Sequence, residues 1–246
     1  MVALWLAMIV FAAFGIEAAL GFGCNVLAVT VAIHLMPLEQ LLPVLVSLNL
    51  LVSAWIAIRH REHVDRRALL TRILPLMLAG MPLGIFLFAF ASGPWLKGGF
   101  GLFVLTLATV ELSRALRASR EARPIPLSSG ASAAVLVLGG LMHGLYASGG
   151  PMAVYHASRC VAGKRRFRST LSALWLLLNL LLLASYAWRG ALTVQTLRLA
   201  GPQLLPLGLG VAGGEALHAR IDERAFRLLV FSLLAAGGLV LLLSMI

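Results

Sequence analysis

Two glycine-containing breaks interrupt long apolar runs of this chain, and their backbone groups could bind a solute. The later break is Tyr146-Ala147-Ser148-Gly149-Gly150-Pro151, near the middle of a run from Ala131 to Val161, and the earlier one is Gly21-Phe22-Gly23-Cys24-Asn25. Glycine permits irregular turns that leave backbone N–H and C=O groups unpaired. Inside a bilayer, such turns are tolerated only where protein or a watery cavity surrounds them. We therefore expect the two breaks to face each other and to form a solute site.

The start of a helix after each break would suit an anion. Helix N-termini carry free N–H groups and partial positive charge, so helices that begin at Gly23 and at Gly150 would offer a cradle without a buried cation. Pro151 fits the first turn of the second helix, where its missing N–H costs little. Glycine also permits close helix packing in membranes, so the competing interpretation is that the glycines at the breaks serve only to pack helices. The candidate solute-binding residues at the breaks are Gly21, Gly23, Cys24, Asn25, Ser148, Gly149, Gly150 and Pro151.

Four further polar residues are candidates for the same site. Glu17 and His143, which lie 126 positions apart, precede the two breaks. An ionisable group at membrane depth is costly, so both are proton-coupling candidates, although either could be neutral and merely hydrogen-bonded. Asn49 and Asn179 could donate side-chain N–H groups to the solute or could simply link helices, and we include both among the candidate solute-binding residues.

The composition places these residues in a membrane protein. Hydrophobic residues make up 61% of the 246 residues and charged residues 12%, which is far more apolar surface than one soluble core could bury. The net charge is +11, but the 20 basic residues sit in short clusters between apolar runs, as in cytoplasmic loops beside anionic lipid headgroups. We therefore expect the lipid bilayer as a partner, and not nucleic acid. Cys24 and Cys160 give no disulfide framework or thiolate metal site, and we expect no cofactor.

The apolar runs predict an all-α polytopic architecture. The first run, Val2 to Met36, would extend roughly 50 Å as one helix, against a hydrocarbon core of about 30 Å. Gly15, Glu17, Gly21 and Gly23 interrupt it, so we interpret it as two short helices. Its start lacks the basic region of a signal peptide, so we expect it to stay in the mature protein. The other expected spans are Leu41 to Ile58, Leu69 to Ala91, Leu96 to Leu112, Thr170 to Trp188, Leu197 to Leu217 and Ala225 to Met245.

The two halves of the chain match each other as an internal repeat. The matched pairs are Gly23 with Gly149 and Cys24 with Gly150 at an offset of 126, and Asn49 with Asn179, Gly80 with Gly210 and Gly84 with Gly214 at an offset of 130. We predict one membrane transporter domain over residues 1–246, with repeat one at 1–117, a polar linker at 118–129 and repeat two at 130–246.

Basic residues predict the orientation in the membrane. Seventeen of the 20 basic residues lie in the loop after Ile58, in the central linker, in the loop after the second break and in the last loop. If each broken run is a hairpin that returns to its own side, all of these lie in the cytoplasm, as the positive-inside rule requires. Each half then has an odd number of crossings, so the repeats are inverted and both termini are extracytoplasmic. We expect re-entrant hairpins with arms of roughly 12 residues that meet from opposite faces.

The sequence resembles the TauE/SafE family of membrane permeases. The segments that carry the resemblance are Gly21-Phe22-Gly23-Cys24-Asn25, Ser148-Gly149-Gly150-Pro151, Phe167-Arg168-Ser169-Thr170 and Asn179. Cys24, Asn25 and Ala147 stand where the family usually has glycine. The resemblance implies a secondary transporter in the cytoplasmic membrane, not an enzyme, and a small anionic solute such as sulfite or an organosulfonate.

Two other functions fit parts of the sequence. A proton-coupled cation or metal permease could use Glu17, His143 and Cys24 as ligands, although these residues do not form a recognisable ligand spacing.

An intramembrane serine protease could pair Ser148 with His143, His156 or His218, because a base near a serine activates it. Against this, Tyr146 occupies the place where rhomboid-type proteases have glycine. The sequence leaves open the direction of transport, the coupling ion and whether the protein forms a homo-oligomer.

Overall fold

The computed structural model describes residues 2–90, 93–117 and 127–218, together with short pieces between 231 and 243. All regular structure in these residues is helical, so the all-α prediction is confirmed. The first half contains α1 (Val2–Leu20), α2 (Cys24–Ala32), α3 (Leu38–Arg59), η1 (Arg61–His63), α4 (Arg66–Ala68), η2 (Leu69–Ile73), α5 (Leu74–Phe90) and α6 (Gly93–Arg117). The second half contains α7 (Ser129–Tyr146), α8 (Gly150–Cys160), α9 (Lys164–Trp188), α10 (Val194–Ala200), η3 (Gly201–Gln203) and α11 (Leu204–His218).

Both predicted breaks separate two helices. The first lies between α1 and α2, and the second lies between α7 and α8. Gly21 and Gly23 have φ angles of 87° and 100°, and Ala147 has a φ angle of 52°. Glycine adopts this left-handed backbone readily, whereas alanine does so only at a cost. The local conformation at the first break therefore explains why glycines stand there.

The helices that precede the breaks are longer than predicted. α1 has 19 residues and α7 has 18, so they are roughly 28 Å and 27 Å long, in place of arms of roughly 12 residues. α1 continues through Gly15 and Glu17, which the sequence suggested as interruptions, because Gly15 packs closely against the backbone of Gly210 in α11. The helices that follow the breaks are short, with 9 residues in α2 and 11 in α8.

Five helical segments are long and apolar enough to cross a membrane, so the chain is a membrane protein with several candidate spans. They are Ala3–Leu20, Leu38–Arg59, Arg66–Phe90, Ser129–Tyr146 and Lys164–Trp188, with a shorter apolar helix at Pro94–Val110. Large apolar side chains on their outer faces are exposed, among them Trp5, Phe86 and Leu181, as suits contact with lipid. The expected span Ala225 to Met245 lies largely outside the described residues.

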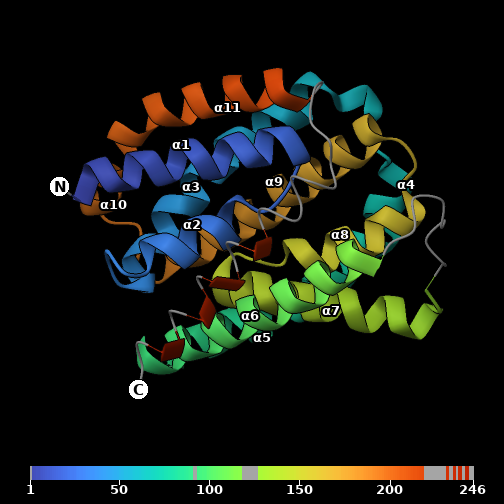
Figure 1. Ribbon diagram of the computed structural model, residues 1–246, viewed down its shortest axis with the longest axis horizontal. Helices are drawn as coiled ribbons and strands as arrows, with labels where there is room; N and C mark the ends of the chain where they lie inside the picture. Colours follow the sequence, from blue (N-terminus) through green and yellow to red (C-terminus); the bar gives the residue numbers. More distant parts are fainter. Residues whose placement is uncertain are drawn as a thin grey trace.

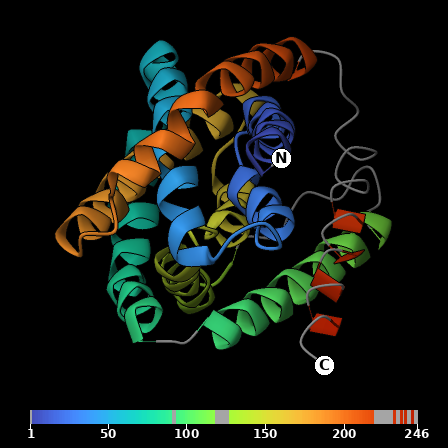
Figure 2. The ribbon, with the colours of Figure 1, turned by 90° about the vertical axis from the view of Figure 1, so that its left-hand side faces the viewer.

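The long helices pack mainly in pairs that join the two halves of the chain. α1 lies along α11, α5 lies along α7, and α3 lies along α9 (Figure 1). In Figure 1, α11 lies at the upper edge and α6 toward the lower edge, with α3 and α9 between them. Figure 2 again shows α11 near the upper edge and α6 toward the lower edge.

Glycines allow two of these pairs to approach closely. A Cβ atom at Gly84 of α5 would lie 2.1 Å from the carbonyl oxygen of Leu141 in α7, and one at Gly214 of α11 would lie 2.1 Å from that of Gly15 in α1. Only glycine fits such a contact, which is a common way of packing helices in membranes. Gly84 and Gly214 are one of the pairs matched by the repeat in the sequence, and they have the same packing role.

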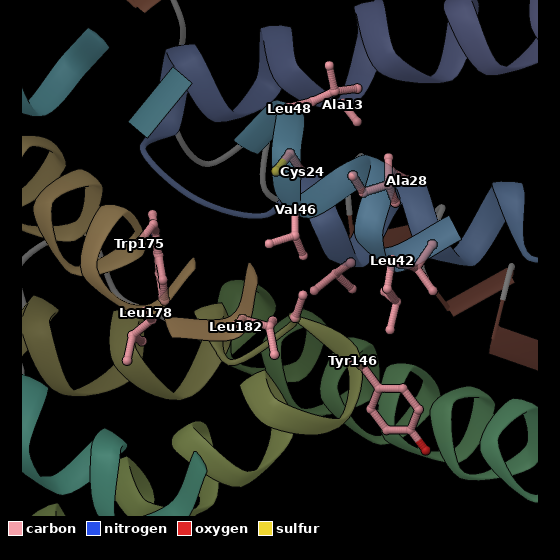
Figure 3. Packing of buried hydrophobic residues seen from close by; sticks show 14 of the residues in the cluster. Ala13, Cys24, Ala28, Leu42, Val46, Leu48, Tyr146, Trp175, Leu178 and Leu182 are labelled. Atoms are coloured by element: carbon pink, nitrogen blue, oxygen red, sulfur yellow. The ribbon is translucent and has the colours of Figure 1, made fainter. Parts of the chain in front are cut away.

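An apolar core fills the space between the short helix α2 and the pair α3 and α9. Ala28, Val46 and Leu182 belong to this core and are buried. Figure 3 shows part of it, with Cys24 at the start of α2 and Trp175 on α9. The core therefore fixes the first turn of α2 against two long helices.

Candidate functional site

A small cavity lies between the first turns of α2 and α8. Its empty volume is about 280 Å³, including the space at its open side. Most of the candidate residues line it, namely Glu17, Gly23, Cys24, Asn25, Asn49, His143, Ser148 and Gly150. Gly21, Gly149, Pro151 and Asn179 do not line it, and Val26, Ala147 and Trp175 line it without having been predicted.

The two breaks face each other across this cavity, as predicted. The Asn25 side chain donates a hydrogen bond from Nδ2 to the carbonyl oxygen of Ala147, at 2.9 Å. The first turns of α2 and α8 have no side-chain cap, since neither Gly23 nor Gly149 can supply one. Backbone N–H groups in a first helical turn have no intrahelical partner, so the cavity is bordered by potential donors.

Asn49 connects the carboxyl group of Glu17 to the pair α3 and α9. Its Nδ2 atom lies 2.9 Å and 2.8 Å from the two Glu17 carboxyl oxygens and 2.8 Å from Cys24 Sγ. Its Oδ1 atom accepts hydrogen bonds from Asn179 Nδ2 and, at 3.0 Å, from Ser53 Oγ. The two repeat-matched asparagines therefore meet, and Asn179 links α9 to α3 behind the cavity wall, whereas Asn49 both lines the cavity and links helices.

His143 forms the opposite wall of the cavity. Its side chain is 1% exposed, and neither ring nitrogen has a hydrogen-bond partner among the described residues. The Asn179 amide lies beside the ring without completing a well-formed hydrogen bond. Buried polar side chains in folded proteins nearly always have a partner. The His143 ring is therefore available to a solute in the cavity.

Trp175 fixes the His143 ring and was not predicted. The two rings stack, with centroids 5.9 Å apart and planes 15° from parallel. Trp175 Nε1 also donates a hydrogen bond to the carbonyl oxygen of Gly21, at 3.0 Å. Trp175 lies four residues before Asn179 in the same helix, and this spacing places both on one face. That spacing was the signal in the sequence that could have identified it.

Gly149 has a packing role in place of the predicted turn role. Its φ angle is −72°, which any residue adopts, but a Cβ atom there would lie 2.3 Å from the carbonyl oxygen of Gly139. Gly150 differs, because a Cβ atom there would meet only Trp175, at 3.9 Å. Tyr146 points away from the cavity toward α6, where its ring lies 5.0 Å from that of Phe100 (Figure 3).

Arg168 packs against the first break and has an acidic partner. Its backbone and stem pack against Gly21, where an added Cβ atom would lie 3.1 Å away. Its Nη2 atom lies 3.2 Å from Glu215 Oε1. This ion pair connects α9 to α11 and leaves the positive charge of Arg168 partly neutralised.

The metal alternative receives little support from the geometry. Among the described residues, one group of three potential ligands has its ligand atoms within 4.8 Å of one another, and it consists of His60, Glu62 and His63 in the loop after α3. Glu17, Cys24 and His143 share the cavity without forming such a group.

The protease alternative requires a histidine in contact with Ser148, and the described residues show no such contact at the break. Ser148 Oγ donates to the carbonyl oxygen of Tyr146, at 2.8 Å, and not to a histidine. The side chain of His156 contacts a different serine, with Nδ1 2.8 Å from Ser132 Oγ. The side chain of His218 lies outside the described residues.

The fold and the cavity together define a polytopic α-helical membrane protein with a buried polar site between the starts of two short helices. The family model for the sulfite exporter TauE/SafE matches residues 6–241. The chain therefore belongs to the TauE/SafE family, which is a family of membrane transporters. Comparisons with curated proteins and with solved structures found no match.

Proposed function

We propose that this protein is a secondary transporter that moves sulfite or an organosulfonate across the cytoplasmic membrane, with the solute bound in the cavity between α2 and α8. The observation that carries the proposal is the combination of two uncapped helix starts with the unpartnered His143 ring in one cavity. Helix starts and imidazole N–H groups donate hydrogen bonds, which the oxygens of a sulfur oxyanion accept. Membership of the sulfite exporter family supports the same class of solute.

The proposed transport mechanism is alternating access between two inverted repeats. In Figure 1, α2 returns toward the end of the molecule at which α1 begins, and α8 returns toward the opposite end, at which α7 begins. Each long pair has one helix from each half of the chain: α1 packs against α11, α5 packs against α7, and α3 packs against α9. This arrangement fits two hairpins that enter from opposite faces, with the solute site between them.

The proposed orientation places the loop after α3 and the start of α9 in the cytoplasm. These two basic segments meet, because the backbone N–H of Asp65 donates a hydrogen bond to Thr170 Oγ1 at 2.9 Å and the Asp65 carboxylate lies 3.3 Å from Arg166 Nη2. Clustered basic residues on one side agree with the positive-inside rule. The lipid bilayer and a small anion are the proposed partners, and a homo-oligomer remains a prediction.

Flux into proteoliposomes tests the proposed solute class. We expect uptake or release of sulfite and of small organosulfonates, and no movement of divalent metal ions. Metal flux without anion flux would favour the rival permease, whereas peptide cleavage without flux would favour the protease.

A single added methyl group tests the position of the site. Gly150→Ala places a methyl group in the cavity at an ordinary contact distance from Trp175, so the protein should fold while sulfite flux falls by about tenfold. The matched control is Gly130→Ala in α7, where a Cβ atom would meet nothing within 4 Å. Equal flux in both variants would place the solute elsewhere.

A further inference from the structure

We infer that the Glu17 carboxylate is a built-in competitor of the transported anion, so that the anion binds only when Glu17 carries a proton. The inference rests on the anion site proposed above and adds to it which group must change charge. Glu17 lines the cavity, and its side chain is 2% exposed. It therefore occupies the same enclosed space as the proposed solute.

The Glu17 carboxyl group already uses donors that an anion would need. Asn49 Nδ2 is within 2.9 Å of both of its oxygens, and the carboxyl group also lies against the backbone N–H of Cys24 at the start of α2. An amide NH₂ group has only two protons to donate. As long as Glu17 is ionised, the donors on the α2 side of the cavity are committed to it.

The charges around Glu17 do not compensate for a second negative charge. From α9, Arg168 acts on Glu17 at longer range, but it is paired with Glu215 of α11. Two other titratable side chains line the cavity with Glu17, namely the Cys24 thiol of α2 and the His143 ring of α7. The α3 side chain in contact with Glu17 is Asn49, which is neutral. Within the described ranges, no Lys or Arg forms a salt bridge with Glu17. Two anions in one buried cavity repel each other strongly because little water screens them.

A proton on Glu17 removes this conflict in two ways. It cancels the negative charge, and it turns the carboxyl group from an acceptor into a donor through its O–H. The anion then meets donors on both walls, with Glu17 and Asn49 on one side and the unpartnered ring of His143 on the other. A monovalent anion that binds together with this proton adds no net charge to the cavity. Each anion that crosses is thereby coupled to a proton.

Binding of methanesulfonate to purified protein tests this inference, because the anion of a strong acid keeps its single negative charge across the pH range of the experiment. Parent protein should bind it more weakly as the pH rises, by up to about tenfold per pH unit, because the bound complex holds one more proton. In the pH range where the affinity falls, binding in weakly buffered solution should take up as much as one proton per anion, which requires no variant.

Variants assign the proton to a residue. Glu17→Gln keeps the shape and the Asn49 contact, so it should bind methanesulfonate with an affinity that no longer depends on pH. His143→Gln should bind weakly at every pH, and Glu39→Gln, an exposed carboxyl at the start of α3, should behave as the parent does.

The outcomes separate this inference from the proposed function. Binding by Glu17→Gln with the parental pH dependence, or binding by the parent with the same affinity and without proton uptake at every pH, would overturn the inference and leave the anion site in place. No binding of methanesulfonate or sulfite by the parent or by Glu17→Gln at any pH would overturn both.

Discussion

Ala147 is strained by its position at the second break. It is the one non-glycine residue with a positive φ angle in the described part of the chain. Its carbonyl oxygen accepts the hydrogen bond from Asn25 that joins the two breaks. The conformation is therefore fixed by a contact across the cavity and not by the preference of alanine.

We expect Ala147→Gly to be tolerated and to raise the free energy of unfolding by up to about 1 kcal/mol. Glycine adopts this backbone without the steric cost that alanine has, although its more flexible unfolded state offsets part of the gain. Thermal unfolding in detergent measures the effect. The control is Ala153→Gly, a buried helical position in α8, which should lose about 1 kcal/mol. A loss of the same size at both positions would contradict the role of the left-handed backbone.

At the scale of helices, the contact between α1 and α11 depends on which face of α11 carries glycine. Gly213 and Gly214 are neighbours, yet a Cβ atom at Gly213 would meet nothing within 4 Å, whereas one at Gly214 would lie 2.1 Å from the carbonyl oxygen of Gly15. Backbone cannot move aside as a flexible side chain can. Close approach of these helices therefore requires glycine at 214 and not at 213.

We expect Gly214→Ala to lower the free energy of unfolding by about 1–3 kcal/mol, because the added methyl group forces α1 and α11 apart. Gly213→Ala should be neutral or slightly stabilising, because it removes backbone freedom from a helical position with open space. Thermal unfolding and the yield of folded protein in detergent compare the two variants. Similar losses in both would mean that helix packing does not set the stability of this pair.

At the scale of the whole molecule, the proposed orientation places the linker between α6 and α7 in the cytoplasm and the loop between α9 and α10 outside. Leu192 in the latter loop is 39% exposed, so a cysteine there is accessible to a reagent. Ser119 lies in the linker, outside the described residues. These two loops therefore report on opposite sides of the membrane.

We expect a membrane-impermeant thiol reagent to label Leu192→Cys in sealed cells and to leave Ser119→Cys unlabelled until the membrane is permeabilised. The background lacks Cys24 and Cys160. The reason for the expected pattern is the clustering of basic residues, which keeps such loops in the cytoplasm. Labelling of Ser119→Cys in sealed cells would contradict the hairpin arrangement and the inverted repeats that depend on it.

The sequence by itself determined the helical class, the membrane location, the family and the positions of both breaks. These properties follow from local features, such as apolar runs and glycine clusters, which act without regard to distant residues. The length of α1 was misjudged because Gly15 looked like a helix breaker. Its neighbour across the packing interface, Gly210, explains why a glycine belongs inside that helix.

Only the tertiary structure decided what each polar residue contacts. The sequence could not tell that Asn49 lies on the cavity while its repeat partner Asn179 lies behind it, or that Trp175 stacks on His143. Gly149 and Gly150 are neighbours in the chain, yet one packs against α7 and the other borders the cavity. Such differences arise because side-chain surroundings depend on helices distant in sequence, and no local pattern records which neighbours these helices bring.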